Sequence, residues 1–514
     1  MVYLSKSKYC GLWQCPKIAW MRKFKPGEAY FDGSVLARME AGNEVGDLAM
    51  GLFGPYVEVT AYSDGKLDLP AMMAATEAEM AKGTENICEA SFSYNGLYCA
   101  VDILRKDGGG WAIYEVKSST KHRKDDGSYE DDKEIYIADI SYQKYVLEHC
   151  GVRVTGTYLV CLNGDYVFDG TLDLTGLFFV SDVAEAVKSE IKNIEYNVAV
   201  AEKILESETE PDIDLSASCK KPYQCAFWDY CTRHVPEQSV FNVYRLNFRK
   251  KIEYYRKGWI TYRDLLLNAP ITNEKQLRQI RFGLEDMGTY VDRAELAAFL
   301  DRLSYPLYFL DFETMQPVVP RFIGTRPYTQ IPFQYSLHYI EREGGELMHK
   351  EFLAESGPDP RRALAERLCE DIPPDVCVTA YNQAFECTRI KELAAAFPDL
   401  AEHLLSIRDN IVDLLVPFQS GWYYNRAMGG SFSIKSVLPA IFPDDPELDY
   451  HNLEGVHNGG EAMSVFPKIK DMPPDEQAKA RRDLLKYCEL DTYAMVKVWE
   501  ELVRAAKEDN MNEF

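Results

Sequence analysis

The stretch Leu307–Thr314, which reads LYFLDFET, organises the sequence. Its continuous run of apolar and aromatic residues is typical of a buried strand, and side chains two apart on a strand lie on the same face. Asp311 and Glu313 are therefore predicted to project together from the end of a core strand. Two adjacent carboxylates repel one another unless a cation lies between them, and oxygen ligands suit Mg²⁺ or Mn²⁺. Taken alone, such a pair is more often a solvated strand end.

Two downstream segments change that interpretation. Val376–Tyr381 (VCVTAY) is a second strand-like run, and Glu386 follows it at the start of a segment with helical composition. Leu484–Val498 (LLKYCELDTYAMVKV) predicts an amphipathic helix. Tyr487 and Asp491 lie four residues apart in it and therefore share one helix face.

The order of these motifs is DxE, then N-x3-acid, then Y-x3-D. It resembles the DEDD (DnaQ-like) 3′–5′ exonucleases, in the subclass with a tyrosine in the third motif. The resemblance covers about residues 300–510 and implies a ribonuclease-H-like domain that holds two Mg²⁺ or Mn²⁺ ions. Tyr487 would position or deprotonate the attacking water. The implied metal ligands are Asp311, Glu313, Glu386 and Asp491. The family usually has Asp where this chain has Glu386, and Asp413 is the candidate that could complete the site instead.

A second set of charged residues lies on a predicted hairpin. Leu97–Leu104 and Trp111–Lys117 are strand-like, and a glycine-rich turn separates them. Asp102 lies on the first arm, and Glu115 and Lys117 alternate onto one face of the second. Asp102 and Glu115 can share a divalent metal. Lys117 can orient or deprotonate a water, or neutralise charge on a phosphate.

This set, together with Gln143 on a following predicted helix, resembles the RecB-like branch of the PD-(D/E)xK nucleases. The resemblance implies a restriction-endonuclease-type core. The implied catalytic residues are Asp102, Glu115, Lys117 and Gln143. The branch commonly has a histidine where this chain has Gly46, and Glu44 is the nearest replacement. A surface charge pair on a hairpin is the alternative interpretation.

Three cysteines, Cys219, Cys225 and Cys231, follow with five residues between each pair. Such a set in a cytosolic protein suggests a metal or iron–sulfur site. RecB-like nucleases with an iron–sulfur cluster are similar in plan, which implies a 4Fe-4S cluster with Cys15, rather than the nearby Cys10, as fourth ligand. A Cys₄ zinc site and three unliganded buried cysteines remain as alternatives.

The length of 514 residues suggests several domains. We expect a RecB-like nuclease domain over 1–240, a helical connector over 241–300 and a DEDD exonuclease-like domain over 301–514, all of α/β class. No stretch approaches the ~18 apolar residues that span a membrane, and the N-terminus lacks the apolar core of a signal peptide. We therefore expect a cytoplasmic protein with no membrane partner, whose thirteen cysteines are thiols or metal ligands.

The formal net charge of −24 argues against a protein that coats nucleic acid by bulk charge. The basic stretch Arg245–Lys257 could follow a phosphate backbone or be a solvated helix face. Lys435, in a turn that enters a predicted helix, could meet a phosphate. The expected function is metal-dependent hydrolysis of phosphodiester bonds, with DNA or RNA as partner. One alternative keeps only the C-terminal site catalytic, with the N-terminal domain as a nucleic-acid-binding module, and another is binding without catalysis.

Overall fold

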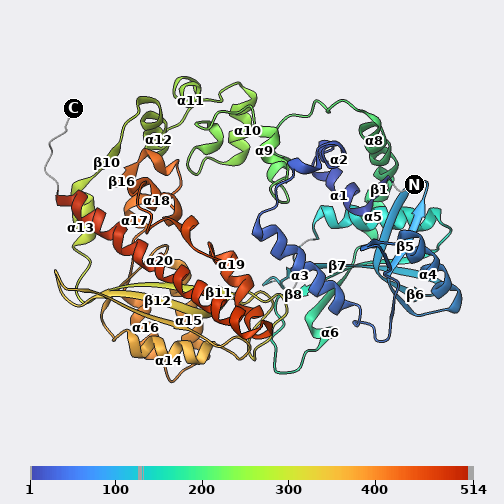
Figure 1. Cartoon of the computed structure of the whole chain (residues 1–514). Helices are drawn as coiled ribbons and strands as arrows, with labels where there is room; N and C mark the ends of the chain where they lie inside the picture. The colour runs from blue at the N-terminus through green and yellow to red at the C-terminus, as the bar shows by residue number, and fades with distance from the viewer. Residues whose placement is uncertain (1–2, 126–129, 131, 508–514) are drawn as a thin grey trace. The chain divides into compact units, whose positions relative to one another are not determined.

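The computed structural model describes residues 3–125, 130 and 132–507, which form two compact units (Figure 1). One unit comprises Met1–His234 and Pro317–Thr329, and the other comprises Val235–Gln316 and Gln330–Phe514. Both are mixed α/β. This division differs from the expected one in two ways. The connector expected over 241–300 is part of the second unit, and Pro317–Thr329 belongs to the first because its valines are buried in that unit's core. No helix in the described ranges is long and apolar enough to cross a membrane.

The first unit is built around a seven-stranded sheet in the order β2-β5-β6-β7-β8-β9, with β1 paired beside β6. The strands are β1 (Leu4–Ser5), β2 (Val57–Glu58), β5 (Asn86–Tyr94), β6 (Leu97–Asp107), β7 (Gly110–Lys121), β8 (Val154–Asn163) and β9 (Phe178–Asp182). A separate small hairpin pairs β3 (Tyr62–Ser63) with β4 (Lys66–Leu67). The main helices are α1 (Lys6–Gln14), α2 (Lys17–Phe24), α3 (Gly33–Ala49), α4 (Leu69–Lys82), α5 (Glu134–His149), α6 (Leu174–Leu177), α7 (Ala184–Glu190), α8 (Ile194–Glu206) and α9 (Trp228–Thr232).

The predicted hairpin is confirmed as β6 and β7. Gly108 and Gly109 form its turn with φ of 50° and 84°, in the left-handed region that glycine adopts without strain. The next connection, from β7 to β8, joins parallel strands and therefore needs a crossover, which contains α5. As a result α5 packs beside the strands that carry Asp102 and Glu115.

The second unit contains a five-stranded sheet in the order β13-β12-β11-β14-β15. Its strands are β11 (Leu307–Met315), β12 (Ile331–Ile340), β13 (Leu347–Leu353), β14 (Cys377–Ala380) and β15 (Ile411–Asp413), and a separate pair joins β10 (Thr289–Val291) to β16 (Tyr423–Asn425). The helices are α10 (Phe248–Arg256), α11 (Tyr262–Asn268), α12 (Glu274–Glu285), α13 (Arg293–Leu300), α14 (Arg361–Asp371), α15 (Ala384–Ala396), α16 (Ala401–Asp409), α17 (Val416–Ser420), α18 (Ile434–Ile441), α19 (Gly459–Val465) and α20 (Pro474–Lys507). The first three strands of the order are antiparallel, whereas β11, β14 and β15 are parallel.

The predicted core strand is confirmed as β11, and its side chains alternate between two hydrophobic layers. Leu310 packs in one cluster with residues of α14, α15 and α16. Leu307 and Phe309 pack in another with Met495 and Val496 of α20. Figure 1 shows α20, coloured red, lying along this sheet. Asp311 continues the second row and therefore faces α20.

Candidate functional site

The acids of β11 meet an acid from the long helix α20. One carboxylate oxygen from each of Asp311, Glu313 and Asp491 lies within 4.8 Å of the other two. Glu313 and Asp491 are buried, each with 7% of its surface exposed. The ladder between β11 and β12 shifts register at Glu313/Thr314, and irregularities of this kind often re-aim side chains beside functional sites. The predicted convergence of these three residues is therefore present in the structure.

The electrostatics of this group are unfavourable for three carboxylates alone. Burial raises the pKa of Asp311 and Glu313 well above the usual range, and the nearby charge of Asp491 raises both further. No lysine or arginine in the described part of the chain forms an ion pair with any of the three. The charge of Lys435 offsets only part of this repulsion. Three clustered acids with one nearby side-chain cation fit a divalent metal ion, since oxygen ligands of this kind hold Mg²⁺ or Mn²⁺.

Two tyrosines and a lysine complete the surroundings of Asp491. The hydroxyl of Tyr450 donates a 2.6 Å hydrogen bond to Asp491 Oδ1, and the hydroxyl of Tyr487 also bonds to Asp491. Lys435 Nζ donates to the Tyr487 hydroxyl over 3.3 Å. Burial and the surrounding carboxylates raise the pKa of Tyr487 far above its usual value. Tyr487 is therefore a neutral phenol that orients its neighbours through hydrogen bonds.

Glu386 lies in the first turn of α15 and is buried, with 3% of its surface exposed. It is not part of the group within 4.8 Å, but its charge raises the pKa of Asp311 and Glu313. Burial raises the pKa of Glu386 itself to about 8. Its Oε2 has no hydrogen-bond partner among the described residues. Asp413 differs, because its Oδ1 accepts the backbone N–H groups of Asn382 and Leu415 and so stabilises the local loops.

The predicted residues of the first unit also come together. Gln143 Nε2 donates to Glu115 Oε2 over 2.6 Å and to Asp139 Oδ1 over 2.9 Å. Lys117 pairs with Glu115 and, over 2.8 Å, with Asp139. Asp102 Oδ2 accepts the backbone N–H of Val116 over 2.7 Å, which holds its carboxylate toward the arm that carries Glu115.

Lys6, the first residue of α1, occupies the centre of this set. Its ammonium group donates to both oxygens of Glu115 over 2.9 and 3.0 Å and to Asp102 over 3.4 Å. Burial lowers the pKa of Lys6, but the charges of Asp102, Asp139 and Glu115 raise it more, and the net result is well above its usual value. The carboxylates are therefore balanced by Lys6 and Lys117 without an ion, and a metal between Asp102 and Glu115 requires Lys6 to withdraw.

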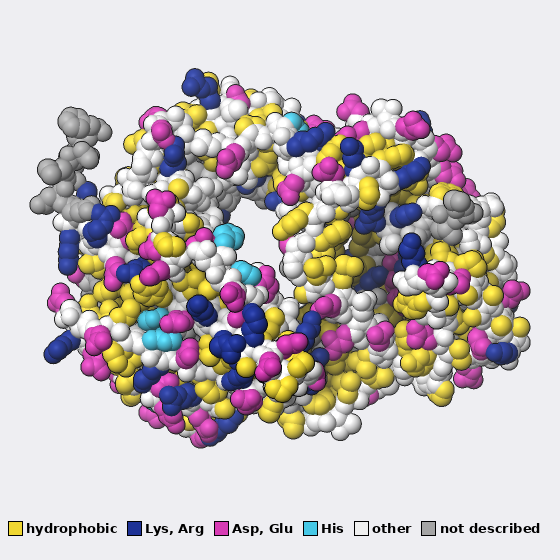
Figure 2. Space-filling view, in the orientation of Figure 1, with side chains coloured by type: hydrophobic (Ala, Val, Ile, Leu, Met, Phe, Trp, Pro, Cys, Tyr) yellow, Lys and Arg dark blue, Asp and Glu magenta, His cyan; other side chains and the backbone are white. Residues whose placement is uncertain are grey.

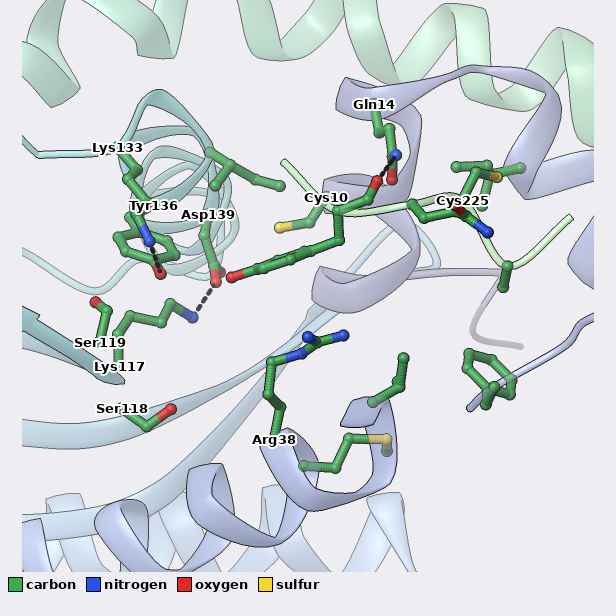
Figure 3. Close-up of a pocket in the computed structure, with 18 of the residues that line it drawn as sticks. Cys10, Gln14, Arg38, Lys117, Ser118, Ser119, Lys133, Tyr136, Asp139 and Cys225 are labelled. Carbon is green, nitrogen blue, oxygen red and sulfur yellow. Dashed lines mark hydrogen bonds and ion pairs between the residues drawn. The ribbon is translucent and has the colours of Figure 1, made fainter. Parts of the chain in front are cut away.

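A cavity of about 740 Å³ adjoins Lys117 (Figure 3). Figure 3 shows Lys117 reaching toward Asp139, with Lys133 beside Tyr136 and Arg38 on the opposite wall. The lining combines cations and aromatic rings, namely Arg22, Arg38, Lys117, Lys133, Tyr30, Phe31, Tyr136, Tyr223 and Tyr328. Glu44, which could have replaced the missing histidine, instead pairs with Arg321 over 3.1 Å. Nothing lies within 4 Å of a Cβ built on Gly46.

The four predicted cysteine ligands, Cys15, Cys219, Cys225 and Cys231, line one small cavity. Cys15 directly follows the last residue of α1. Cys219 Sγ accepts a hydrogen bond from the backbone N–H of Ser216 over 3.4 Å. Burial raises the pKa of Cys225 to about 11, and the nearby charges of the other three cysteines add to this effect. A thiol with a raised pKa is neutral at pH 7, so a metal that bound here would have to displace its proton. Cys10 lines the other cavity, beside Lys117.

Comparison with known proteins adds one partial match. The model of a family described as a domain of unknown function, DUF2779, matches residues 308–433. The matched stretch contains Asp311, Glu313 and Glu386 but ends before Tyr487 and Asp491. No curated protein matches the chain.

Four residues at these sites were missed from the sequence: Lys6, Asp139, Tyr450 and Glu89, the last of which lies close enough to Asp102 for that charge to raise its pKa. Asp139 had a usable signal, because it lies four residues before Gln143 on one face of a predicted helix. Glu89 has φ of 58°, a left-handed conformation inside a strand that spacing does not reveal. Lys6 is separated from Glu115 by 109 positions, and no local pattern links them.

Proposed function

We propose that the chain is a metal-dependent nuclease whose second unit hydrolyses phosphodiester bonds from 3′ ends. The observation that carries this proposal is the group formed by Asp311, Glu313 and Asp491, three clustered acids, two of them buried, that form no ion pair with another described side chain. Bound Mg²⁺ or Mn²⁺ would activate a water and stabilise the leaving oxygen. Tyr487 and Lys435 orient groups beside Asp491, and Glu386 on α15 lies close enough for its charge to act on Asp311 and Glu313.

The arrangement of the second sheet supports this assignment. The sheet has three antiparallel strands, β13, β12 and β11, followed by β14 and β15, which run parallel to β11. The central strand β11 carries the acids, and α20 packs against the sheet. This arrangement fits a ribonuclease-H-like DEDD domain. In the first unit, the contacts among Asp102, Glu115, Lys117 and Gln143 support a RecB-like PD-(D/E)xK core.

Surface charge supports nucleic acid as the substrate despite the net charge of −24. Figure 2 shows Lys and Arg side chains gathered near the N-terminal end of α20, the helix that carries Tyr487 and Asp491. The exposed basic residues of this segment are Lys468, Lys470, Lys479, Arg482 and Lys486. Local positive charge of this kind holds the phosphate backbone of a substrate.

Digestion of end-labelled single-stranded DNA and RNA with Mn²⁺ tests the proposal. We expect Asp311→Ala to abolish shortening from the 3′ end. Tyr487→Phe should retain activity reduced by about 10²–10⁴, the range for a lost proton-transfer or positioning group, and Lys117→Ala should leave this activity intact. Equal rates for wild type and Asp311→Ala on both substrates would refute the assignment.

A second candidate function concerns the first unit. Its cationic and aromatic cavity fits single-stranded nucleic acid, since bases stack on aromatic rings and phosphates meet cations. Lys6 pairs with Asp102 and Glu115, the two carboxylates that a catalytic metal would need, and this favours a binding role over catalysis. The test uses the Asp311→Ala background with Lys6→Ala added. New Mn²⁺-dependent cleavage that Lys117→Ala removes would make this unit a second nuclease. No cleavage, with binding retained, would make it a nucleic-acid-binding module.

The four cysteines support a 4Fe-4S cluster more than zinc. A tetrahedral zinc site has Zn–S distances of ~2.3 Å and so places its sulfurs about 3.8 Å apart. Within the described ranges, the groups of ligand atoms that approach within 4.8 Å do not include these cysteines. The wider spacing suits a multinuclear cluster, which needs a reducing compartment such as the cytoplasm to assemble on free thiols.

A further inference from the structure

Two histidines of the second unit face each other across neighbouring strands. His338 of β12 and His349 of β13 are directly paired in the antiparallel ladder, and their ring centroids are 4.5 Å apart. Directly opposite residues lie on the same face of a sheet, here the face along which α20 packs. Glu489 of α20 completes the group, because one ligand atom from each of the three residues lies within 4.8 Å of the other two.

A hydrogen-bond network fixes which ring nitrogens are free. Thr492 Oγ1 donates to Glu489 O over 3.1 Å, and it lies 2.7 Å from Ser336 Oγ and 2.8 Å from His338 Nδ1. Ser336 Oγ in turn lies 3.0 Å from His349 Nε2. Each hydroxyl has a single hydrogen, so all four contacts are satisfied only when His338 Nδ1 and His349 Nε2 both donate. The lone pairs of His338 Nε2 and His349 Nδ1 are then free to bind a cation.

The charges around the group also suit metal binding. Glu351 lies opposite Ser336 in the ladder and is electrostatically coupled to both His349 and Glu489. Neutral imidazoles beside carboxylates form the ligand set that zinc-type metals prefer.

We propose that His338, His349 and Glu489 bind a divalent transition metal of the zinc type, separate from the ions of the Asp311 group. Two nitrogens and one carboxylate leave a fourth position for water. Ligand bonds of ~2.0–2.2 Å require the three atoms to lie closer together than the 4.8 Å limit within which they are found, and the exposed Glu489 side chain has room to move toward the histidines. The ion would join α20 to the β12–β13 pair and thereby hold Tyr487 and Asp491 in place.

Zinc content measures this site directly. The full chain is dialysed against Zn²⁺ with excess Mg²⁺, which competes at the all-oxygen group of Asp311 but not at imidazole ligands. We expect His349→Ala and Glu489→Gln to bind one zinc fewer per chain than wild type. The matched control is His403→Ala on α16, whose ring bonds only to the backbone of Ile372, and it should bind as much zinc as wild type.

A second variant tests the network. Thr492→Val keeps the shape of the buried side chain but removes the hydroxyl that fixes the His338 tautomer. Loss of such an outer hydrogen bond should weaken zinc binding about 10–100-fold. Because Glu489 is exposed, Glu489→Gln should keep the fold, which circular dichroism checks. Equal zinc content in wild type, His349→Ala and Glu489→Gln would overturn the proposal, and unchanged affinity in Thr492→Val would overturn the role given to the network.

Discussion

At the residue scale, Glu386 combines burial with an unsatisfied oxygen. A buried acceptor without a partner costs about 1–3 kcal/mol, and Glu386 Oε2 has none among the described residues. Burial also raises the pKa of Glu386 to about 8, so above that pH the folded chain holds a buried charge that Gln would remove. We predict that Glu386→Gln stabilises the metal-free protein above pH 8 but lowers Mg²⁺-dependent nuclease activity at least ~100-fold, as expected when an electrostatic group is lost from an active site. Thermal unfolding without added metal and rate measurements with Mg²⁺ check both parts. Asp413→Asn is the control, because Asp413 bonds to backbone groups. Full activity of Glu386→Gln would exclude it as a ligand.

The raised pKa of Glu89 should make the free energy of unfolding fall as the pH rises. Burial and the charge of Asp102 raise its pKa from 4.5 to about 7. Between these values the folded chain holds a proton that the unfolded chain has lost, so this residue lowers stability as the pH rises. Glu89→Gln should therefore be more stable than wild type at pH 8, by at most about 3 kcal/mol, and nearly equal at pH 5. Urea unfolding at both pH values measures the difference, and an equal gap at both would contradict the prediction.

At the element scale, two glycines of the first unit should respond oppositely to alanine. Gly46 lies inside α3 with open space around a built Cβ, so Gly46→Ala should stabilise the protein by about 0.5–1 kcal/mol. Gly110 starts β7, and a Cβ there would lie 2.5 Å from Arg153 O. Gly110→Ala should therefore destabilise by roughly 1–3 kcal/mol. Denaturant midpoints measure both changes. A destabilising Gly46→Ala would mean that this open space has an occupant.

Each strand or helix that was predicted correctly carries its own pattern in a short stretch of sequence. The apolar run of β11, the glycine turn between β6 and β7, and the amphipathic pattern of α20 are each readable within about a dozen residues. Those site residues that lie on these elements, such as Asp311 on β11 and Asp491 on α20, were therefore predictable from the sequence. The role of Lys6 was not predictable, because its partners, Asp102 and Glu115, lie on strands about a hundred positions further along the chain. The pairing of His338 with His349 depended on the register of β12 and β13, which neither strand specifies alone.

At the scale of the whole molecule, the cysteines join the start of the first unit to the end of its N-terminal segment, since Cys15 and Cys231 line one cavity. We predict that purified protein contains iron and sulfide, and that Cys15→Ser loses the metal and lowers the unfolding temperature. Cys10→Ser is the matched control and should keep both, because Cys10 lines a different cavity. Metal analysis and visible absorption under anaerobic conditions distinguish the outcomes. Zinc without iron would indicate a Cys₄ zinc site, and no metal in wild type would contradict both versions.

The assignment of Pro317–Thr329 to the first unit has a consequence for synthesis on the ribosome. Val318 and Val319 are buried in that unit's core, yet they are translated long after His234, where the earlier part of the unit ends. At ~5–20 residues per second, the nascent first unit would wait several seconds for its last core residues. By then β11 has also emerged, without its partner β12. The first unit therefore cannot complete its core before part of the second unit has been made, and a chaperone that shields β11 until β12 has emerged would have a defined task.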